Sequence, residues 1–317
     1  MAQRTQRLTA EVAPERVERL DPNTLSRNEL RSTPGLYRRA WRRYRRNKIA
    51  MVALSVFVVI VLFVLSADML SRYVTHVTYW KGNLRGQFLA PFSEGHILGT
   101  DSNGRDVLTR LAYGGRVSLL VAGLAVLTTL TIGSAVGAIA GYFGGFLDSF
   151  FMRLVDVLLA IPGLPLLILI FALYRPNAAG LAIVLGLLSW AGVARLIRGE
   201  VLSIRGRDYV DAARVIGASN GRIIWRHIFP NIVPIIVVWI SLAIPSVILA
   251  EAALSYLGFG VQVPTPSWGN MLQGAKDYYT RSWTNVFIPG FMIYITVLAI
   301  NLVGNGLRDA LDPRLND

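Results

Sequence analysis

The sequence predicts an all-α membrane protein with six transmembrane helices, and two observations support this fold class. First, the chain of 317 residues is 53% hydrophobic and only 16% charged, with a mean hydropathy of +0.48, which is too apolar for a water-soluble domain. Second, six apolar runs have about 17 residues or more, enough for a helix to cross the hydrocarbon core of a bilayer. These runs are residues 49–67, 117–141, 154–173, 178–194, 228–256 and 286–304.

The chain begins with a polar segment, residues 1–35, whose mixed charge and lack of an apolar stripe predict a disordered cytoplasmic tail. Residues 36–70 are expected to form an amphipathic entry helix and the first transmembrane helix. In "LYRRAWRRYRRNK", Tyr37, Trp41 and Tyr44 recur at helical spacing among arginines, which is typical of a helix on an anionic membrane surface. RNA binding is the alternative interpretation; because the chain is so apolar, we favour the membrane and expect no nucleic acid partner.

The rest of the chain is expected to comprise an extracytoplasmic segment (71–116), a five-helix core (117–308) with a polar loop at 195–227, and a short tail (309–317). Six spans place both termini on the same side of the membrane. The 32 Lys and Arg residues exceed the 19 Asp and Glu residues, and arginine is concentrated in the loops on the side of the N-terminus. The positive-inside rule therefore predicts a multi-pass protein of the cell (inner or plasma) membrane with both termini in the cytoplasm.

Prolines interrupt the apolar runs, and each one removes a helical hydrogen bond and bends the helix. In lipid, the carbonyls that lose a partner need another donor or a wet cavity, so these runs favour a bundle around a path over a simple anchor. Glycines spaced four apart at Gly133, Gly137 and Gly141 predict a face for close helix packing. The prolines are Pro162 and Pro165 in the third run, Pro230, Pro234 and Pro245 in the fifth, and Pro289 in the sixth.

The loop between the fourth and fifth runs contains "YVDAARVIGASNGRIIWRHIFP", which is too polar to cross a membrane and too patterned to be a slack loop. Asp208 is expected to cap a short helix at its N-terminus, with Asp211 completing a box-like arrangement. Gly217 is placed to end that helix, and Ser219 or Asn220 to cap a second one. The first helix is expected to present the small residues Ala212, Ala213 and Gly217 on a cytoplasmic projection suited to another protein's groove.

This stretch resembles the cytoplasmic signature of ABC importer permeases, which reads Glu-Ala-Ala, three residues, Gly, nine residues, Ile-x-Leu-Pro. Asp211 stands in the place of the glutamate, and Gly217 falls at the required spacing. His227 and Phe229 depart from the signature at its membrane end, which puts little doubt on docking. The matching positions are Asp211, Ala212, Ala213, Gly217 and Pro230.

Four other stretches are similar to the dipeptide, oligopeptide and nickel permease subfamily, and the resemblance covers residue 36 to the end. The arginine-rich lead into "NKIAMVALSVF" is similar to the second permease subunit of each pair. The four stretches are "HILGTDSNGRDVLTRLAYGGRVSL", "GYFGGFLDSFFMRLVDVLLAIPGLPL", "EAALSYLGFGVQVPTPSWGNML" and "GNGLRDALDPRL".

The resemblance implies a type I ABC importer permease fold, with a cytoplasmic coupling helix that contacts an ATPase through Tyr209, Asp211, Ala212, Ala213 and Gly217. It implies as partners a second permease subunit, two ABC ATPase subunits and an extracytoplasmic solute-binding protein. ATP and Mg²⁺ would bind the ATPases, and this chain would hold no cofactor and no catalytic residue. The chain's own residues agree on one point: none of its three lysines follows a glycine, so it has no phosphate-binding loop of the G-x-x-x-x-G-K-[ST] type.

Peptides are the expected cargo, and nickel or another small solute is the alternative. The three histidines lack metal-ligand spacing and there is no cysteine, so we expect no metal site. Glu251 is the deepest acid in the apolar runs: it could receive a peptide amino terminus or a cation, or bond to a partner subunit at the outer gate. Asp156 is expected to pair with Arg153, and Asp101 to cap a helix from about Ser102.

Two other classes of protein fit the sequence less well. An ion-coupled secondary transporter needs several coupling carboxylates or histidines and usually internal repeats, whereas Glu251 is the one convincing deep acid. A membrane-integral enzyme needs a dense cluster of His, Asp or Glu in or beside the spans, and the sequence contains none.

Overall fold

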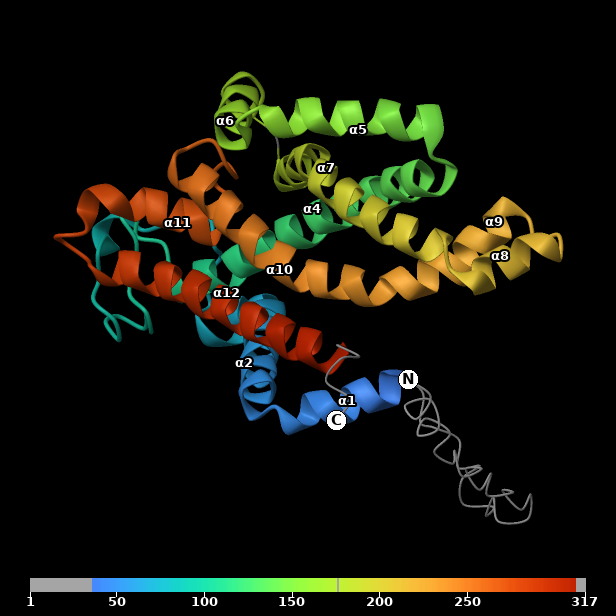
Figure 1. The fold of residues 1–317 in the computed structure, drawn as a ribbon. Coiled ribbons are helices and arrows are strands. Elements are labelled where there is room, and N and C mark those ends of the chain that lie inside the picture. The colour runs from blue at the N-terminus through green and yellow to red at the C-terminus, as the bar shows by residue number, and fades with distance from the viewer. Residues whose placement is uncertain (1–35, 176, 312–317) are drawn as a thin grey trace, which may run out of the picture. The chain divides into compact units, whose positions relative to one another are not determined.

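The computed structural model describes residues 36–175 and 177–311, and the predicted tail at 1–35 and the end of the tail at 309–317 lie outside them. All regular secondary structure in these described ranges is helical, without a β-strand (Figure 1). The chain divides into two compact units, 1–39 and 40–317. Of the first unit, only the opening residues of α1 (Leu36–Arg46) are described. The expected all-α fold class is confirmed.

Five helices are long and apolar enough to cross a membrane. They are α2 (Lys48–Leu65), α4 (Val107–Phe143), α7 (Ala178–Arg205), the continuous helical stretch Asn220–Tyr256, and α12 (Thr284–Leu311). Four of these helices contain a predicted apolar run and extend beyond it, whereas α2 ends at Leu65, two residues before the end of its predicted run. α4 begins ten residues before its run, inside the segment predicted as 71–116.

The third predicted run is not one helix. α5 (Gly145–Ala160) and α6 (Gly163–Leu173) meet at 80°, so the count is six spans only if this bent pair forms one. The chain breaks at Ile161, which is extended (φ −84°, ψ 127°), as expected for a residue before a proline. Pro234, Pro245 and Pro289 instead stay inside unbroken helices. The same residue type therefore produces a break in one span and at most a bend in the others.

The short elements gather at the two ends of α10 (Phe229–Tyr256). α8 (Asp208–Val215) and α9 (Asn220–Ile223) lie near its beginning and α11 (Trp268–Ala275) near its end, as Figure 1 shows. The segment between α2 and α4 also lies at the end that carries α11. Its Thr100 carbonyl accepts a hydrogen bond from the Asn285 side-chain amide, at the start of α12, which packs against α11. The remaining short elements are α3 (Ala67–Met69), the π-helices η1 (Leu70–Val74) and η3 (Ile224–Ile228), and the 3₁₀ helices η2 (Leu84–Gly86) and η4 (Lys276–Tyr278).

α4 and α7 pack closely along the predicted glycine face. A Cβ added to Gly137 would lie 2.5 Å from the Ala194 carbonyl oxygen, and one added to Gly133 would lie 2.7 Å from the Val193 Cβ. These distances leave no room for a side chain, so the small residues allow the two backbones to approach. The predicted packing role of these glycines is confirmed, and α4 and α7 form a tight pair.

Two ion pairs join α5 to α7. Asp156 pairs with Arg195, and Asp148 with Arg198. The prediction that Asp156 pairs with Arg153 is wrong, because the Asp156 carboxylate reaches the neighbouring helix instead of the preceding turn.

Asp106, and not Asp101, caps the start of α4. The Thr109 backbone N–H donates to the Asp106 carboxylate over 2.7 Å, and the His96 ring nitrogen Nδ1 lies 2.8 Å from the other carboxylate oxygen. Asp101 instead accepts the backbone N–H groups of Asn103 and Arg105, within a turn that precedes the helix. The expected cap was therefore misplaced by five residues, because both acids lie in turn-forming sequence.

Candidate functional site

The start of α8 differs from the prediction. Arg207 is the N-cap residue in an extended conformation, Asp208 is already helical, and no side chain caps this end. Asp208 and Asp211 both lie in the first turn, where negative charge is favourable near the helix N-terminus. The Asp211 carboxylate accepts a hydrogen bond from the Arg214 guanidinium at 2.7 Å. The predicted capping by Asp208 is thus wrong, and Asp211 forms an exposed ion pair within its own helix.

Gly217 ends α8 as predicted. Its φ of +83° lies in the left-handed region, which glycine adopts without a steric penalty. The Ala218 N–H donates to the Ala213 carbonyl at 3.0 Å and the Gly217 N–H to the Arg214 carbonyl at 2.9 Å. These two bonds form a Schellman motif, which satisfies the last carbonyls of the helix.

The second short helix is capped by Ser219, whose hydroxyl accepts the Arg222 N–H at 3.4 Å. Asn220, the other predicted cap, has a different partner, because its side-chain oxygen accepts the hydroxyl of Tyr142 on α4 at 2.8 Å. α9 then continues through η3 into α10. The chain from Gly217 to α10 is therefore held by local caps and by a hydrogen bond to α4.

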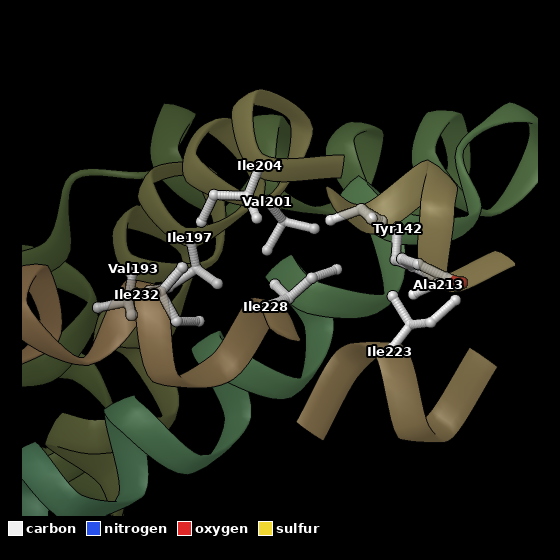
Figure 2. Packing of buried hydrophobic residues seen from close by; sticks show 10 residues of the cluster. Tyr142, Val193, Ile197, Val201, Ile204, Ala213, Ile223, Ile228 and Ile232 are labelled. Carbon is white, nitrogen blue, oxygen red and sulfur yellow. The ribbon is translucent and has the colours of Figure 1, made fainter. Parts of the chain in front are cut away.

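One apolar cluster joins α8 and α9 to three long helices (Figure 2). Val210 and Ala213 of α8 and Ile223 of α9 are buried in it. We call this group the coupling cluster. Its other members are Val193, Ile197, Val201 and Ile204 of α7, Ile228 of η3, Ile232 of α10 and Tyr142 of α4.

The outer face of α8 is exposed and partly apolar. Ala212 and Gly217 are exposed as predicted, and so is Tyr209, but Ala213 is buried. The prediction that both alanines are exposed is wrong for Ala213, because residues three apart share a helix face and Val210 already faces inward. Val215 and Ile216, which the sequence analysis did not single out, are 88% and 84% exposed. They are two apolar residues directly before the glycine that ends the helix, and that pattern could have revealed them.

Glu251 lies at the other end of α10 and is completely buried, with 0% of its surface exposed. Its two carboxylate oxygens accept hydroxyls of the same chain, from Ser118 on α4 at 3.0 Å and from Ser255 on α10 at 2.7 Å. In this structure its side chain is closed off from solvent. A direct substrate contact would require these hydrogen bonds to open.

No cluster in the described part of the chain has the form of a metal site: no three His, Asp or Glu side chains there lie close enough to hold an ion.

The long apolar helices define the class of this protein, a multi-pass membrane permease. The chain belongs to the family of binding-protein-dependent transport system inner membrane components, whose model matches residues 133–317. That match contains both the coupling cluster helices α7 and α10 and the exposed face of α8. A second model, the N-terminal transmembrane domain of oligopeptide transport permease C, matches residues 35–93.

Curated relatives are similar over nearly the whole chain. The dipeptide transport system permease protein of Bacillus subtilis (strain 168) is 40% identical over 277 residues, covering 87% of this chain and 85% of the relative. The oligopeptide transport system permease protein of Haemophilus influenzae is 40% identical over 281 residues, covering 88% and 89%. That of Escherichia coli (strain K12) is 41% identical over 281 residues, covering 88% and 91%.

Proposed function

We propose that this chain is a permease subunit of an ATP-driven importer and forms part of the path for di- or oligopeptides. The relatives that are named as dipeptide and oligopeptide transport permeases support the cargo. The main support for the mechanism is the two-sided burial of α8: one face is buried in the coupling cluster, and the opposite face is exposed. An extracytoplasmic solute-binding protein delivers the peptide, and a second permease subunit completes the path.

In this proposal an ATPase subunit contacts the exposed face of α8. The exposed surface at Tyr209, Ala212 and Gly217 allows a groove of the ATPase to approach closely. The contact would also bury the apolar side chains of Val215 and Ile216, which are exposed in the isolated chain. Asp211 contributes less to the contact, because its carboxylate already pairs with Arg214. ATP and Mg²⁺ bind the two ATPase subunits, while this chain holds no cofactor and catalyses no reaction.

Motion of the ATPase reaches the spans through the coupling cluster. A displacement of α8 moves Val210 and Ala213, which are packed against α7, and Ile223 lies on the path into α10. Protein interiors are close-packed, so such a displacement is passed on instead of being absorbed by empty space. The spans then open the path alternately to the two sides of the membrane.

The proposal requires α8 in the cytoplasm, with both termini on the same side. Because the chain has no cysteine, a single introduced cysteine reports its own side. Gly221 near α8 and Gly274 in α11 are suitable sites, since both are exposed and nothing lies within 4 Å of an added Cβ. We expect a membrane-impermeant maleimide to label G274C in intact cells and G221C only after permeabilisation. The reverse pattern contradicts the orientation.

The function is tested by reconstituting the chain with its second permease, the two ATPases and the binding protein in vesicles. We expect uptake of labelled di- or oligopeptide that requires both ATP and the binding protein. ATP-dependent uptake of Ni²⁺ without peptide uptake would contradict the peptide cargo. Peptide uptake driven by an ion gradient in the absence of the ATPases would contradict the whole proposal.

A further inference from the structure

Glu251 is the centre of a buried hydrogen-bond network, and none of the ion pairs formed by the described residues includes it. A buried acid without a cationic partner is costly in a membrane protein. Here the cost is offset by hydrogen bonds, since the Ser118 and Ser255 hydroxyls both donate to the carboxyl oxygens. The role of Glu251 in the structure is therefore to accept these two hydrogen bonds.

The two serines connect Glu251 to the backbone of the segment after α10. A hydroxyl has one hydrogen and two lone pairs, and both hydrogens are directed at Glu251. The lone pairs receive backbone N–H groups: that of Trp268 reaches Ser118 at 3.3 Å, and that of Val261 reaches Ser255 at 3.2 Å. Glu251 is thus the terminal acceptor that sets the orientation of both hydroxyls.

We call residues 257–275, from the end of α10 through α11, the outer segment. Ser267 caps α11 in a reciprocal box with Asn270 and extends the network to the Ser255 hydroxyl at 3.4 Å. The Asn270 amide also donates to the Val261 and Thr265 carbonyls. The polar groups of the outer segment are therefore tied both to one another and to Glu251.

The outer segment also fits closely against α4 and α10. A Cβ on Gly269 would lie 2.6 Å from the Ala252 Cα, and one on Gly115 would lie 2.7 Å from the Trp268 ring. Trp268 is completely buried, and its ring N–H donates to the Leu111 carbonyl at 3.0 Å. Because the outer segment is closely packed here, the hydrogen-bond network stabilises it in one position.

The outer segment also lines a pocket at the end of α10 opposite α8. Asn270, Met271 and Gln273 of the segment line this pocket together with Asp101 and Arg110. The position of the segment therefore determines the shape of the surface that this end of the chain offers.

We propose that Glu251 is a positioning residue of the outer segment, and that it sets how well this end of the permease accepts the loaded solute-binding protein. This inference rests on the proposed function. Glu251 does not contact the peptide; it acts through Ser118 and Ser255 on the backbone of Val261 and Trp268. Removing the acceptor loosens the segment without changing the ATPase contact at α8.

The test compares E251L, which removes the acceptor, with E251Q, which keeps one carbonyl oxygen. Uptake is measured at increasing concentrations of loaded binding protein in the reconstituted complex. Leaving a buried polar group without its hydrogen-bond partner changes an equilibrium constant by about tenfold or more. We expect E251L to raise the half-saturating concentration about tenfold and to leave maximal uptake within about twofold. E251Q should recover part of this loss, because its single amide oxygen can accept only one of the two serine hydroxyls.

S118A provides a milder variant in case E251L does not fold, and S246A is its matched control. Ser246 is an exposed residue of α10 whose hydroxyl bonds only within its own helix. We expect S118A to raise the half-saturating concentration by a few-fold and S246A to leave it unchanged. Loss of maximal uptake with an unchanged half-saturating concentration in E251L and E251Q alike would overturn the proposal and favour direct substrate contact.

Labelling of a cysteine at Ala275, a buried residue of the outer segment, gives a readout that does not depend on transport. The maleimide should react faster with A275C when E251L is also present, because the buried thiol becomes accessible only when the outer segment opens. Equal labelling rates would overturn the positioning role even if no peptide uptake were seen. Absence of uptake in the unsubstituted complex, together with faster labelling in E251L, would instead contradict the proposed function alone.

Discussion

α8 and α11 are both helices of eight residues at opposite ends of α10, yet they are held in different ways. α8 is attached through apolar side chains, mainly Val210 and Ala213. α11 is attached through directional hydrogen bonds that converge on Glu251. Apolar contacts are non-directional, so α8 can shift without leaving a polar group unpaired. The network at α11 has no such freedom, because each shift breaks a buried hydrogen bond.

α4 joins the two ends. Ser118 belongs to the network around Glu251, and Tyr142, near the other end of the same helix, belongs to the coupling cluster. The difference in attachment suggests a division of roles: the α8 end transmits displacement, and the α11 end preserves a fixed surface. Three pairs of substitutions test this division in the isolated chain, each pair matched for residue type.

The largest effect is expected for Trp268 at the fixed end. W268A removes a fully buried ring together with its hydrogen bond to Leu111, and such substitutions cost about 3–5 kcal/mol. The control is W225A, at the α8 end, where the ring is largely exposed and the expected cost is below about 0.5 kcal/mol. Thermal unfolding of the purified chains measures both. Equal costs would contradict the contrast between the two ends.

The next effect concerns the helix that connects the ends. G137L forces a side chain into the contact between α4 and α7, where the Ala194 carbonyl leaves no space, and overpacking of this kind costs about 1–3 kcal/mol. Gly123 lies on the same helix with nothing within 4 Å of an added Cβ. We therefore expect G123L to unfold at the same temperature as the unsubstituted chain. A comparable loss in both variants would show that α4 and α7 are not tightly paired.

The smallest effect on stability separates the two faces of α8. V210A removes two buried carbons from the coupling cluster, which corresponds to about 1.6 kcal/mol at about 0.8 kcal/mol per buried carbon. V215A changes a side chain that is almost fully exposed and should not alter the stability of the isolated chain. In the assembled transporter we expect V215A to have the larger effect on ATPase binding, because Val215 belongs to the proposed ATPase contact. Purified ATPase should bind the V215A complex more weakly in a pull-down assay, and unchanged binding would exclude Val215 from that contact.

Local sequence features predicted the parts of the molecule that depend on neighbouring residues. The apolar runs located the long helices, the spacing of Gly133 and Gly137 located a close helix contact, and Gly217 located the end of α8. Each of these follows from backbone geometry or from helical periodicity. The permease signature around Asp211 also placed the exposed helix correctly along the chain.

Features that depend on distant residues were missed or misplaced. Ser118 and Glu251 are 133 residues apart, so no local pattern could show that Glu251 is buried by its own chain. The inward orientation of Ala213 depends on where α7 and α10 lie, and the break at Ile161 depends on packing that the prolines alone do not specify. The prediction that Asp101 caps a helix failed because neighbouring turns compete for the same kind of side chain.

The central claim, that the ATPase acts on α8, is tested most directly by ATP-dependent peptide uptake with G217D. Aspartate tolerates the left-handed conformation better than most residues, and the position is open, with nothing within 4 Å of an added Cβ. The chain should therefore still insert and fold. G206D, in the open and exposed turn before α8, is the matched control. We predict that G217D abolishes uptake and ATPase retention while G206D preserves both. Full uptake in G217D would contradict the assignment of α8 as the coupling contact.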